Sequence, residues 1–480
     1  MSSSQVIVVD LDGTLTSADT ILESLLLLVR NKPYLLLILP FWLINGVKYF
    51  RAKITENSSL DVTTLPYNMP FINWLKEQKV NGKKIVLYTE TDECIAKAIT
   101  KHLEIFDDLI FNEKYPNLKN NNKDNTLQEL YGNGGYDYAG SKDTKIDFWT
   151  GASGVIVVNA KEDLLNKVSR VAPVVHTFPK DNIGILDWIK ALRVHQWLKN
   201  LLLFVPLLAS HQFDNTQFIV SVFIAFISFS LSASAVYIIN DLFDLESDRI
   251  HPTKKYRPFA SAKLQIKLGL AVALLLISLS IVLGSFVGVN FSLILLLYLL
   301  ITLAYSLLLK RTVLLDCITL ATLYTTRIIA GAVALSLPLS FWLLAFSVFI
   351  FLSLALVKRY AELVVQKQAG NSISYGRGYV VSDAPLIQQL GISSGYISTL
   401  IIALYVNTEY VASLYAQPQL IWFIIPIVLF WVSWVWLKAA RGEMQDDPVI
   451  FAIKDKTSLV VVFLIIVVFV FATIGISFND

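Results

Sequence analysis

The stretch QFIVSVFIAFISFSLSASAVYII (217–239) runs directly into NDLFDLESDRIHPTKKYRP (240–258). The first part has no Asp, Glu, Lys or Arg, and it is long enough to cross a bilayer as a helix. The second part combines carboxylates with a basic cluster, and ionisable groups beside a membrane span usually serve a function. The junction therefore predicts a spanning helix that ends in a charged segment at the membrane surface.

The composition of the whole chain is typical of a membrane protein. Of its 480 residues, 55% are hydrophobic and 16% are charged, and the mean hydropathy is +0.58. These values lie well outside the average of soluble proteins. The formal net charge of +3 is too small to indicate nucleic-acid binding, so we expect no nucleic-acid partner.

Apolar runs of span length follow one another from about Trp197 onward. We expect nine spanning helices, near residues 197–213, 217–239, 266–287, 290–309, 313–335, 341–360, 389–413, 418–438 and 457–476. The loops on one side are rich in Lys and Arg, whereas HQFDNTQ, VGVN, SLPLS, AQPQ and SFND on the other side carry none. The positive-inside rule then places the N-terminal region and the basic loops in the cytoplasm. We expect a multi-pass protein of the inner (cytoplasmic) membrane, and the sequence leaves a homo-oligomer open.

The composition changes sharply near Ile183, so we divide the chain into a soluble domain at 1–180 and a membrane domain at 181–480. In the soluble part, VIVVD (6–10), KIVLYT (84–89) and GVIVVN (154–159) have the pattern of short buried strands. Amphipathic helical stretches separate them. Strands that alternate with helices predict an α/β domain of Rossmann-like type with a parallel sheet.

The stretch PYLLLILPFWLINGVKYF (33–50) is a further candidate span. A single crossing here would place the strands at 6–10 and 84–89 on opposite sides of the membrane. Pro40, Asn45 and the flanking basic residues instead favour helices that lie on or dip into the bilayer surface.

The charged segment contains Asn240, Asp241, Asp244 and Asp248 at helical intervals of three or four residues. Carboxylates this close repel one another unless a cation lies between them, and hard oxygen ligands suit Mg²⁺ with a bound diphosphate. The basic residues that follow can bind the outer phosphate oxygens; they are Arg249, His251, Lys254, Lys255 and Arg257. The alternative is a solvated helix end with a mixed-charge loop.

This pattern, NDxxDxxxD after the second span, resembles the first aspartate motif of the UbiA-type prenyltransferase superfamily. YSLLLK (305–310) is similar to that superfamily's YSxxLK motif. The resemblance implies an all-α bundle of nine transmembrane helices and a Mg²⁺-dependent reaction. It implies metal ligation by Asn240, Asp244 and Asp248, catalytic roles for Asp241, Asp244 and Asp248, and diphosphate binding by Tyr305, Ser306 and Lys310.

The superfamily's second motif, DxxxD, is absent. LVKRYAEL (356–363) takes its place, with Lys358, Arg359 and Glu362 as the charged residues. This resembles the polyprenyl-phosphate phosphoribosyltransferase branch, which the chain also resembles at RVHQWLKN (193–200) and RGEMQDDPVIFAIKD (441–455). The resemblance implies transfer of a phosphoribosyl group from phosphoribosyl diphosphate to a polyprenyl phosphate.

The chemistry of that transfer suits the charges that are present. A polyprenyl phosphate is already an anionic nucleophile, so it needs cations to hold it near a second anion rather than a general base. The basic residues available for this are Lys199, Lys310, Lys358, Arg359 and Arg377. Arg327 lies inside an apolar run, where it either reaches the site or is paired structurally, with Asp316 as a possible partner.

Three alternatives stay open, and the intact NDxxDxxxD set makes one of them the weakest: a membrane-tethered phosphatase whose helical half only binds lipid. A transferase could move an isoprenyl group from its diphosphate to an aromatic or other small acceptor, although the missing DxxxD motif argues against it. A membrane transporter with a regulatory cytoplasmic domain would place its ionisable residues deep in the spans and show inverted repeats, and neither feature is visible.

VIVVDLDGTLTSAD (6–19) is a strand that runs into DxDGT, and it resembles the first motif of the haloacid dehalogenase superfamily. The resemblance implies that Asp10 is a phosphoryl-accepting nucleophile, that Asp12 is the acid/base, and that both bind Mg²⁺. Thr89 matches the second motif and Lys123, or alternatively Lys119, the third. A helical cap is expected at about 17–75.

The fourth motif departs from that family's pattern. Ser141 and Lys142 stand where the first acid is expected, while Asp143 and Asp147 keep the four-residue spacing but are shifted by two. Either the loop still binds Mg²⁺, with Asp143 as a ligand, or the metal site is damaged. An active phosphatase would have an apt substrate in the polyprenyl-linked ribose phosphate made by the neighbouring domain.

Overall fold

The structure is a computed structural model that describes residues 5–474 except 90, 112–122, 142–146, 161, 181, 213, 371–377, 410, 412–414 and 445–447. The chain forms two compact units. The first comprises Met1–Leu192 and Tyr237–Ala273, and the second Arg193–Val236 and Leu274–Asp480. The charged segment at 240–258 therefore belongs to the same unit as the soluble domain.

The first unit contains a six-stranded sheet in the order β3-β2-β1-β4-β5-β6, in which every neighbouring pair is parallel. Its strands are β1 Val6–Asp10, β2 Lys84–Thr89, β3 Asp108–Phe111, β4 Asp137–Gly140, β5 Gly154–Ala160 and β6 Val174–Pro179. The predicted parallel α/β domain is confirmed, and the three predicted strands are β1, β2 and β5.

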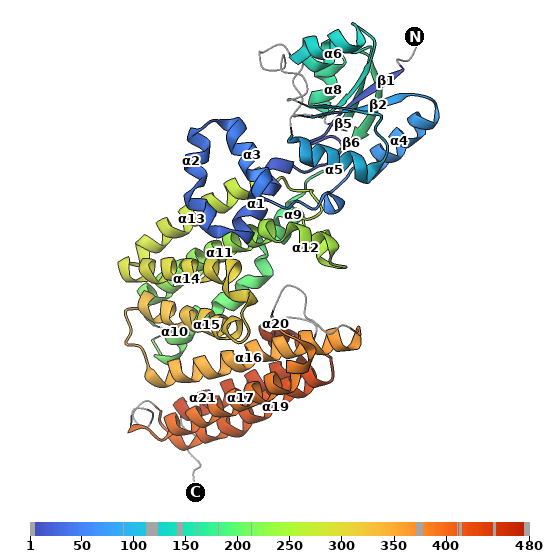
Figure 1. The fold of residues 1–480 in the computed structure, drawn as a ribbon. Coiled ribbons are helices and arrows are strands. Elements are labelled where there is room, and N and C mark those ends of the chain that lie inside the picture. The colour runs from blue at the N-terminus through green and yellow to red at the C-terminus, as the bar shows by residue number, and fades with distance from the viewer. Residues whose placement is uncertain are drawn as a thin grey trace. The chain divides into compact units, whose positions relative to one another are not determined.

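Helices cover both faces of this sheet because its strands are apolar on both sides (Figure 1). Ile7 and Val9 of β1 pack on one face with α4 (Met69–Val80) and α5 (Glu93–Leu103). Val8 packs on the other face with α6 (Lys123–Tyr131), α7 (Asp147–Thr150) and α8 (Glu162–Val168).

Between β1 and α4 lies a helical insertion, which we call the cap. It consists of α1 (Thr20–Asn31), η1 (Pro33–Leu37), α2 (Leu39–Ile44) and α3 (Val47–Asn57), followed by η2 (Val62–Thr64). The cap ends earlier than the predicted residue 75, because Phe71, Ile72 and Leu75 of α4 belong to the core under the sheet. The stretch 33–50 is broken into short helices and is not among the candidate spans of the described residues.

Eight helices of the described residues are long and apolar enough to cross a membrane. They are α11 (Thr216–Phe243), α13 (Ile266–Val287), α14 (Val289–Leu307), α15 (Leu315–Ala334), α16 (Phe341–Gln368), Val381–Val406 with α17 (Ala384–Val406), Pro418–Ala440 with α19 (Ile424–Ala440), and α21 (Lys456–Ile474). Shorter elements join them: α9 (Ile185–Leu192), α12 (Leu245–Ile250), η5 (Lys254–Tyr256), η6 (Leu309–Arg311) and α20 (Pro448–Lys454). The C-terminal part is therefore a helical bundle that holds these eight candidate membrane spans.

The predicted count of nine spans exceeds these eight. The segment expected to span at 197–213 instead forms η4 (Val194–Phe204) and α10 (Val205–Ala209), which together are shorter than a span. Pro206 near the start of α10 has no N–H to donate to a preceding turn. Lys199 and Asn200 in η4 are buried against protein, where the segment packs on α15.

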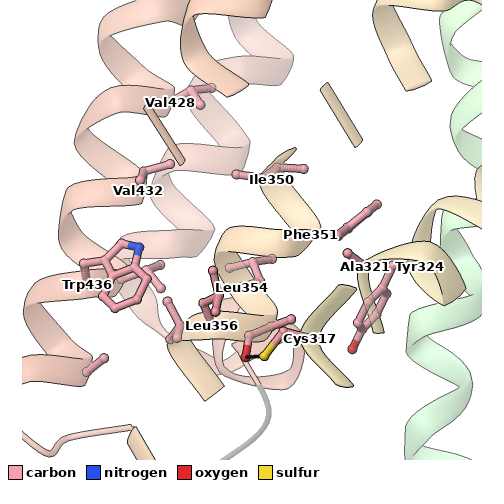
Figure 2. Close-up of a cluster of buried hydrophobic side chains, with 14 of the residues drawn as sticks. Cys317, Ala321, Tyr324, Ile350, Phe351, Leu354, Leu356, Val428, Val432 and Trp436 are labelled. Carbon is pink, nitrogen blue, oxygen red and sulfur yellow. Dashed lines mark hydrogen bonds between the residues drawn. The ribbon is translucent and has the colours of Figure 1, made fainter. Parts of the chain in front are cut away.

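The core of the second unit lies where α15, α16, α17 and α19 meet (Figure 2). Its close packing depends on Gly391 of α17, because a Cβ there would lie 2.0 Å from the ring of Trp436. Trp436 Nε1 donates to Ser353 Oγ (3.1 Å), and that hydroxyl donates to the Gly391 carbonyl (2.7 Å). Packing of α16, α17 and α19 is thus fixed by shape and by a short chain of hydrogen bonds.

Candidate functional site

The charged segment joins the end of α11 to α12, and its two most buried carboxylates share one cation. Arg257 Nη1 donates to Asp248 Oδ2 (2.6 Å) and to Asp241 Oδ1 (3.1 Å). Asp241 and Asp248 are 3% and 2% exposed. Burial raises the pKa of Asp248, while Arg257 acts in the opposite direction. Two carboxylates of the predicted face, Asp241 and Asp248, thus converge on one positive charge, whereas Asp244 lies at the break between α11 and α12.

Asn240 supplies a further oxygen donor on this segment. Its Oδ1 is buried and has no hydrogen-bond partner among the described residues, which is unusual for a buried amide oxygen. An amide oxygen with neighbouring carboxylates is the donor type that Mg²⁺ takes. No group of three His, Cys, Asp or Glu side chains is already assembled around a metal position in the described parts of the chain. The donor chemistry fits Mg²⁺, but Arg257 must move for two of the carboxylates to bind it.

The other charged residues of the segment contact the cap. Arg249 donates from Nη1 and Nη2 to the two carboxylate oxygens of Glu23 at 2.8 and 2.5 Å, and from Nε to the Ala260 carbonyl at 3.1 Å. Arg30 Nη2 lies 3.5 Å from Asp244 Oδ1. Arg249 was predicted to bind phosphate, but in this structure its guanidinium is occupied by Glu23. Lys254 lies exposed in η5.

The remaining predicted residues of the membrane domain fall in the second unit. Tyr305 and Lys310 lie at the end of α14 and in η6, Lys358, Arg359 and Glu362 on α16, and Lys199 in η4. Arg377 lies outside the described residues.

Arg359 is held in a buried polar cluster. Its Nε lies 2.8 Å from Asp316 Oδ2, the two side chains being 1% and 0% exposed, and its Nη1 pairs with Glu362. Tyr379 donates its hydroxyl to Asp316 Oδ1 at 2.5 Å. The stretch LVKRYAEL thus places on α16 a buried guanidinium that two carboxylates of the chain already pair with.

Arg327 is held by hydrogen bonds to side chains and backbone of the helix bundle. Its guanidinium donates to Asn200 Oδ1 (2.9 Å), to the Tyr298 hydroxyl (3.0 Å) and to the Leu323 carbonyl (2.6 Å). Asp316 pairs with Arg359, so the predicted Arg327–Asp316 pair is wrong. Buried amide and phenol groups satisfy Arg327 in place of a carboxylate.

In the α/β domain, the predicted phosphate site lies at the carboxyl ends of β1 and β2. Asp10 ends β1, and its Oδ1 accepts from the Leu11 N–H at 2.9 Å. Thr89 ends β2, and its hydroxyl accepts from the Thr91 N–H at 3.0 Å. Adjacent parallel strands bring these side chains to one edge of the sheet.

Asp12 is the most strongly perturbed acid of this edge. It accepts from the Thr20 N–H (3.2 Å), the Thr20 hydroxyl (3.3 Å) and the Thr91 hydroxyl (3.3 Å). Burial, followed by the nearby charge of Asp19, raises the pKa of Asp12 to about 6. Such a value suits a group that both gives and takes a proton near neutral pH.

Sequence reasoning missed three residues of this edge. Thr20 and Thr91 hold Asp12, and Asn159 Nδ2 donates to the Gly13 carbonyl at 2.7 Å, which fixes the loop after β1. Thr91 stands two residues beyond the end of β2, and Asn159 lies near the end of β5, so their positions at strand ends were the available signal. Lys123 begins α6, but its side chain and Asp143 lie outside the described residues.

A cavity of about 480 Å³ opens above these strand ends. Its floor contains Asp10, Asp12, Thr89 and Thr91. Its walls come from α1 and α3 of the cap, from Lys267 in the first turn of α13, and from the aromatic residues Tyr88, Tyr138 and Phe148. All of these residues belong to the first unit.

The sequence model of the UbiA prenyltransferase family matches residues 201–454. The chain belongs to this family. A Sinorhizobium fredii protein, y4nM, described as uncharacterized, is 35% identical to this UbiA-family chain over 470 residues, which are 97% of this chain and 90% of the relative. That match extends through the α/β domain, so the relative shares both parts.

Other relatives match a smaller share of the chain. The nodulation protein NoeC of Azorhizobium caulinodans is 36% identical over 278 residues, covering 58% of this chain and 90% of the relative. The decaprenyl-phosphate phosphoribosyltransferase of Mycolicibacterium smegmatis is 37% identical over 199 residues, covering 41% of this chain and 62% of that protein. A solved UbiA homolog from Archaeoglobus fulgidus bound to GPP and Mg²⁺ aligns with a TM-score of 0.47 at 16% identity, over 59% of this chain and 99% of that one.

Proposed function

We propose that the membrane domain transfers a phosphoribosyl group from phosphoribosyl diphosphate to a polyprenyl phosphate. The observation that carries this proposal is the buried Arg359 cluster, where a second aspartate motif would serve a prenyl diphosphate donor. Partial similarity to a decaprenyl-phosphate phosphoribosyltransferase supports it. Two anionic substrates need fixed cations more than they need a second metal-binding motif.

In this proposal, residues of the charged segment at 240–258 bind the metal and the diphosphate. Asn240, Asp244 and Asp248 would hold Mg²⁺, which neutralises the diphosphate leaving group. Arg257, released from Asp241 and Asp248, would pair with the diphosphate oxygens instead. Exchange of one anionic partner for another keeps the guanidinium paired throughout.

The bond changes need no general base. The bond between the anomeric carbon and the diphosphate oxygen breaks, and the diphosphate leaves with its electron pair. A phosphate oxygen of the lipid forms the new bond to that carbon. The protein contributes position and charge stabilisation, with Lys199, Lys310 and Lys358 as candidate cations for the lipid phosphate.

The test is a transfer assay with the purified full chain in detergent, Mg²⁺, polyprenyl phosphates of several lengths and radiolabelled phosphoribosyl diphosphate. We expect label in the lipid phase and its loss in Asp244→Asn. Asp214→Asn, a carboxylate in the lysine-free loop before α11, is the matched control and should retain activity. Absence of label with every lipid, together with transfer from an isoprenyl diphosphate to an aromatic acceptor, would replace this proposal by prenyl transfer.

We propose a second activity, a phosphomonoester hydrolase, for the α/β domain. The observation that favours it is the convergence of Asp10, Asp12 and Thr89 on one cavity. Asp10 would attack phosphorus while Asp12 protonates the departing alkoxide. Water would then attack the aspartyl phosphate and return a proton to Asp12, which releases inorganic phosphate.

The phosphoribosyl lipid made by the membrane domain is the proposed substrate. In the transfer assay, the labelled lipid should shift to a dephosphorylated form with the wild-type chain and stay phosphorylated with Asp10→Asn. Phosphate retained on the lipid by both proteins would remove the hydrolase proposal and leave the transferase proposal intact.

A further inference from the structure

The cavity above Asp10 and Asp12 has one wall that a small water-soluble phosphate ester does not require. This wall consists of Ile21, Leu22 and Leu25 of α1 and Phe50 of α3. All four are half-buried, so they keep part of their apolar surface outside the packed core. The polar floor and the apolar wall belong to the same cavity.

The leucines of α1 lie in two different environments. Leu26, Leu27 and Leu28 are between 1% and 7% exposed. Leu22 and Leu25 line the cavity, and Leu25 also packs against the cap core that contains Leu28. Apolar side chains that line a cavity favour an apolar ligand, because they offer no hydrogen bonds to water in the cavity.

The cavity also adjoins the start of a membrane span. Lys267, in the first turn of α13, lines it and lies 2.8 Å from Asp19 Oδ2. In the same unit, η1 and α2 of the cap expose three large apolar side chains, Leu37 (79%), Phe41 (65%) and Ile44 (81%). Apolar residues this exposed, in a unit whose Asp19 pairs with the first turn of α13, favour a cap that touches the bilayer surface.

We propose that this cavity binds a phosphomonoester carried on a membrane-held apolar chain, in preference to a free sugar phosphate. The inference rests on the proposed hydrolase and names its substrate class. The phosphate lies on Asp10, the apolar chain contacts Leu22, Leu25 and Phe50, and the chain continues into the lipid. Arg51 and Lys267 add positive charge for the anionic head group.

The test uses two matched pairs of probes with the full chain in detergent and Mg²⁺. One pair is methyl and octyl ribofuranoside 5-phosphate, with a sugar between chain and phosphate, and the other is methyl and octyl phosphate. Each methylene covered by an apolar wall contributes about fourfold to kcat/KM. We therefore expect the kcat/KM of the octyl probe to exceed that of the methyl probe by about a hundredfold or more in at least one pair. The pair that shows it tells whether the apolar chain joins the phosphate directly or through a sugar.

Variants test whether the wall is the cause. Leu22→Gln and Leu25→Gln should each lower the octyl-to-methyl ratio about tenfold, and both residues are half-buried, so the fold should tolerate them. Leu130→Gln, at an exposed leucine of α6, should leave the ratio unchanged. An unchanged ratio in Leu22→Gln and Leu25→Gln would overturn the inference, because the preference would then come from partition into micelles.

The outcomes separate the two proposals. Equal rates for methyl and octyl probes would overturn this inference while the hydrolase stands. No phosphate release from any probe would remove the hydrolase and this inference together. Octyl preference lost with Leu25→Gln and hydrolysis lost with Asp10→Asn would support both.

Discussion

The pair between Glu23 of the cap and Arg249 of α12 gives the sharpest prediction. Nη1 and Nη2 of Arg249 each donate to one carboxylate oxygen of Glu23, and the side chains of Glu23 and Arg249 are only 3% and 8% exposed. Removing one partner of a buried pair costs about 3–5 kcal/mol, because the other charge stays buried and uncompensated. Glu23→Gln keeps the shape and one acceptor, so we expect about 3 kcal/mol.

Hydrogen exchange of the intact chain in detergent is the suitable measurement, since it reports local opening rather than global unfolding. A loss of about 3 kcal/mol increases opening of α1 and α12 roughly a hundredfold. Phosphoribosyl transfer should fall as well, because α12 carries Asp248, next to Arg249 in sequence. Glu23 would thereby act as a positioning residue for the aspartate segment.

Glu246→Gln is the matched control. It lies on the same short helix, and its carboxylate accepts an exposed hydrogen bond from the Asp61 N–H at 3.1 Å. Exposed contacts of this kind contribute about 0–1 kcal/mol, so exchange should change little. The double variant Glu23→Leu/Arg249→Met should recover most of the protection. Exchange in Glu23→Gln that matches the Glu246→Gln control would refute the reasoning.

Three further predictions follow from the structure. Gly391→Ala places a methyl group 2.0 Å from the Trp436 ring and should destabilise the bundle by about 1–3 kcal/mol, seen as a lower Tm, whereas Gly184→Ala, with no atom nearer than 3.9 Å, should not. Arg327→Met removes three buried hydrogen bonds and should cost about 2–4 kcal/mol; an unchanged Tm would contradict this. Arg257→Gln removes the cation that two buried carboxylates share, and we expect a KM for phosphoribosyl diphosphate at least about tenfold higher with Mg²⁺ saturating; an unchanged KM would exclude a diphosphate contact.

The sequence predicted the elements whose pattern is local. Strands β1, β2 and β5 are apolar along their length, and the spans are long apolar runs, so composition alone identifies them. The edge strand β6 (VVHTFP) was missed because most of its side chains are exposed, and β3 and β4 were missed because each is only four residues long. The first expected span was wrong because hydropathy cannot distinguish burial in lipid from burial against protein, and η4 packs against α15 with Lys199, Asn200 and Leu203 buried.

The sequence predicted which chemical groups the candidate sites contain, but not which of these groups contact one another. Spacing placed Asp241 and Asp248 on one face, yet it could not show that Arg257 bridges them. Glu23 lies 226 residues from Arg249 and belongs to no motif, so nothing local indicates the contact. The consequence is mechanistic: the cap that lines the cavity of the proposed hydrolase also holds α12, which carries Asp248 of the proposed transferase site. A substrate that moves α1 in the proposed hydrolase cavity would therefore also move α12. The exchange experiment on Glu23→Gln measures how strongly α1 and α12 are coupled.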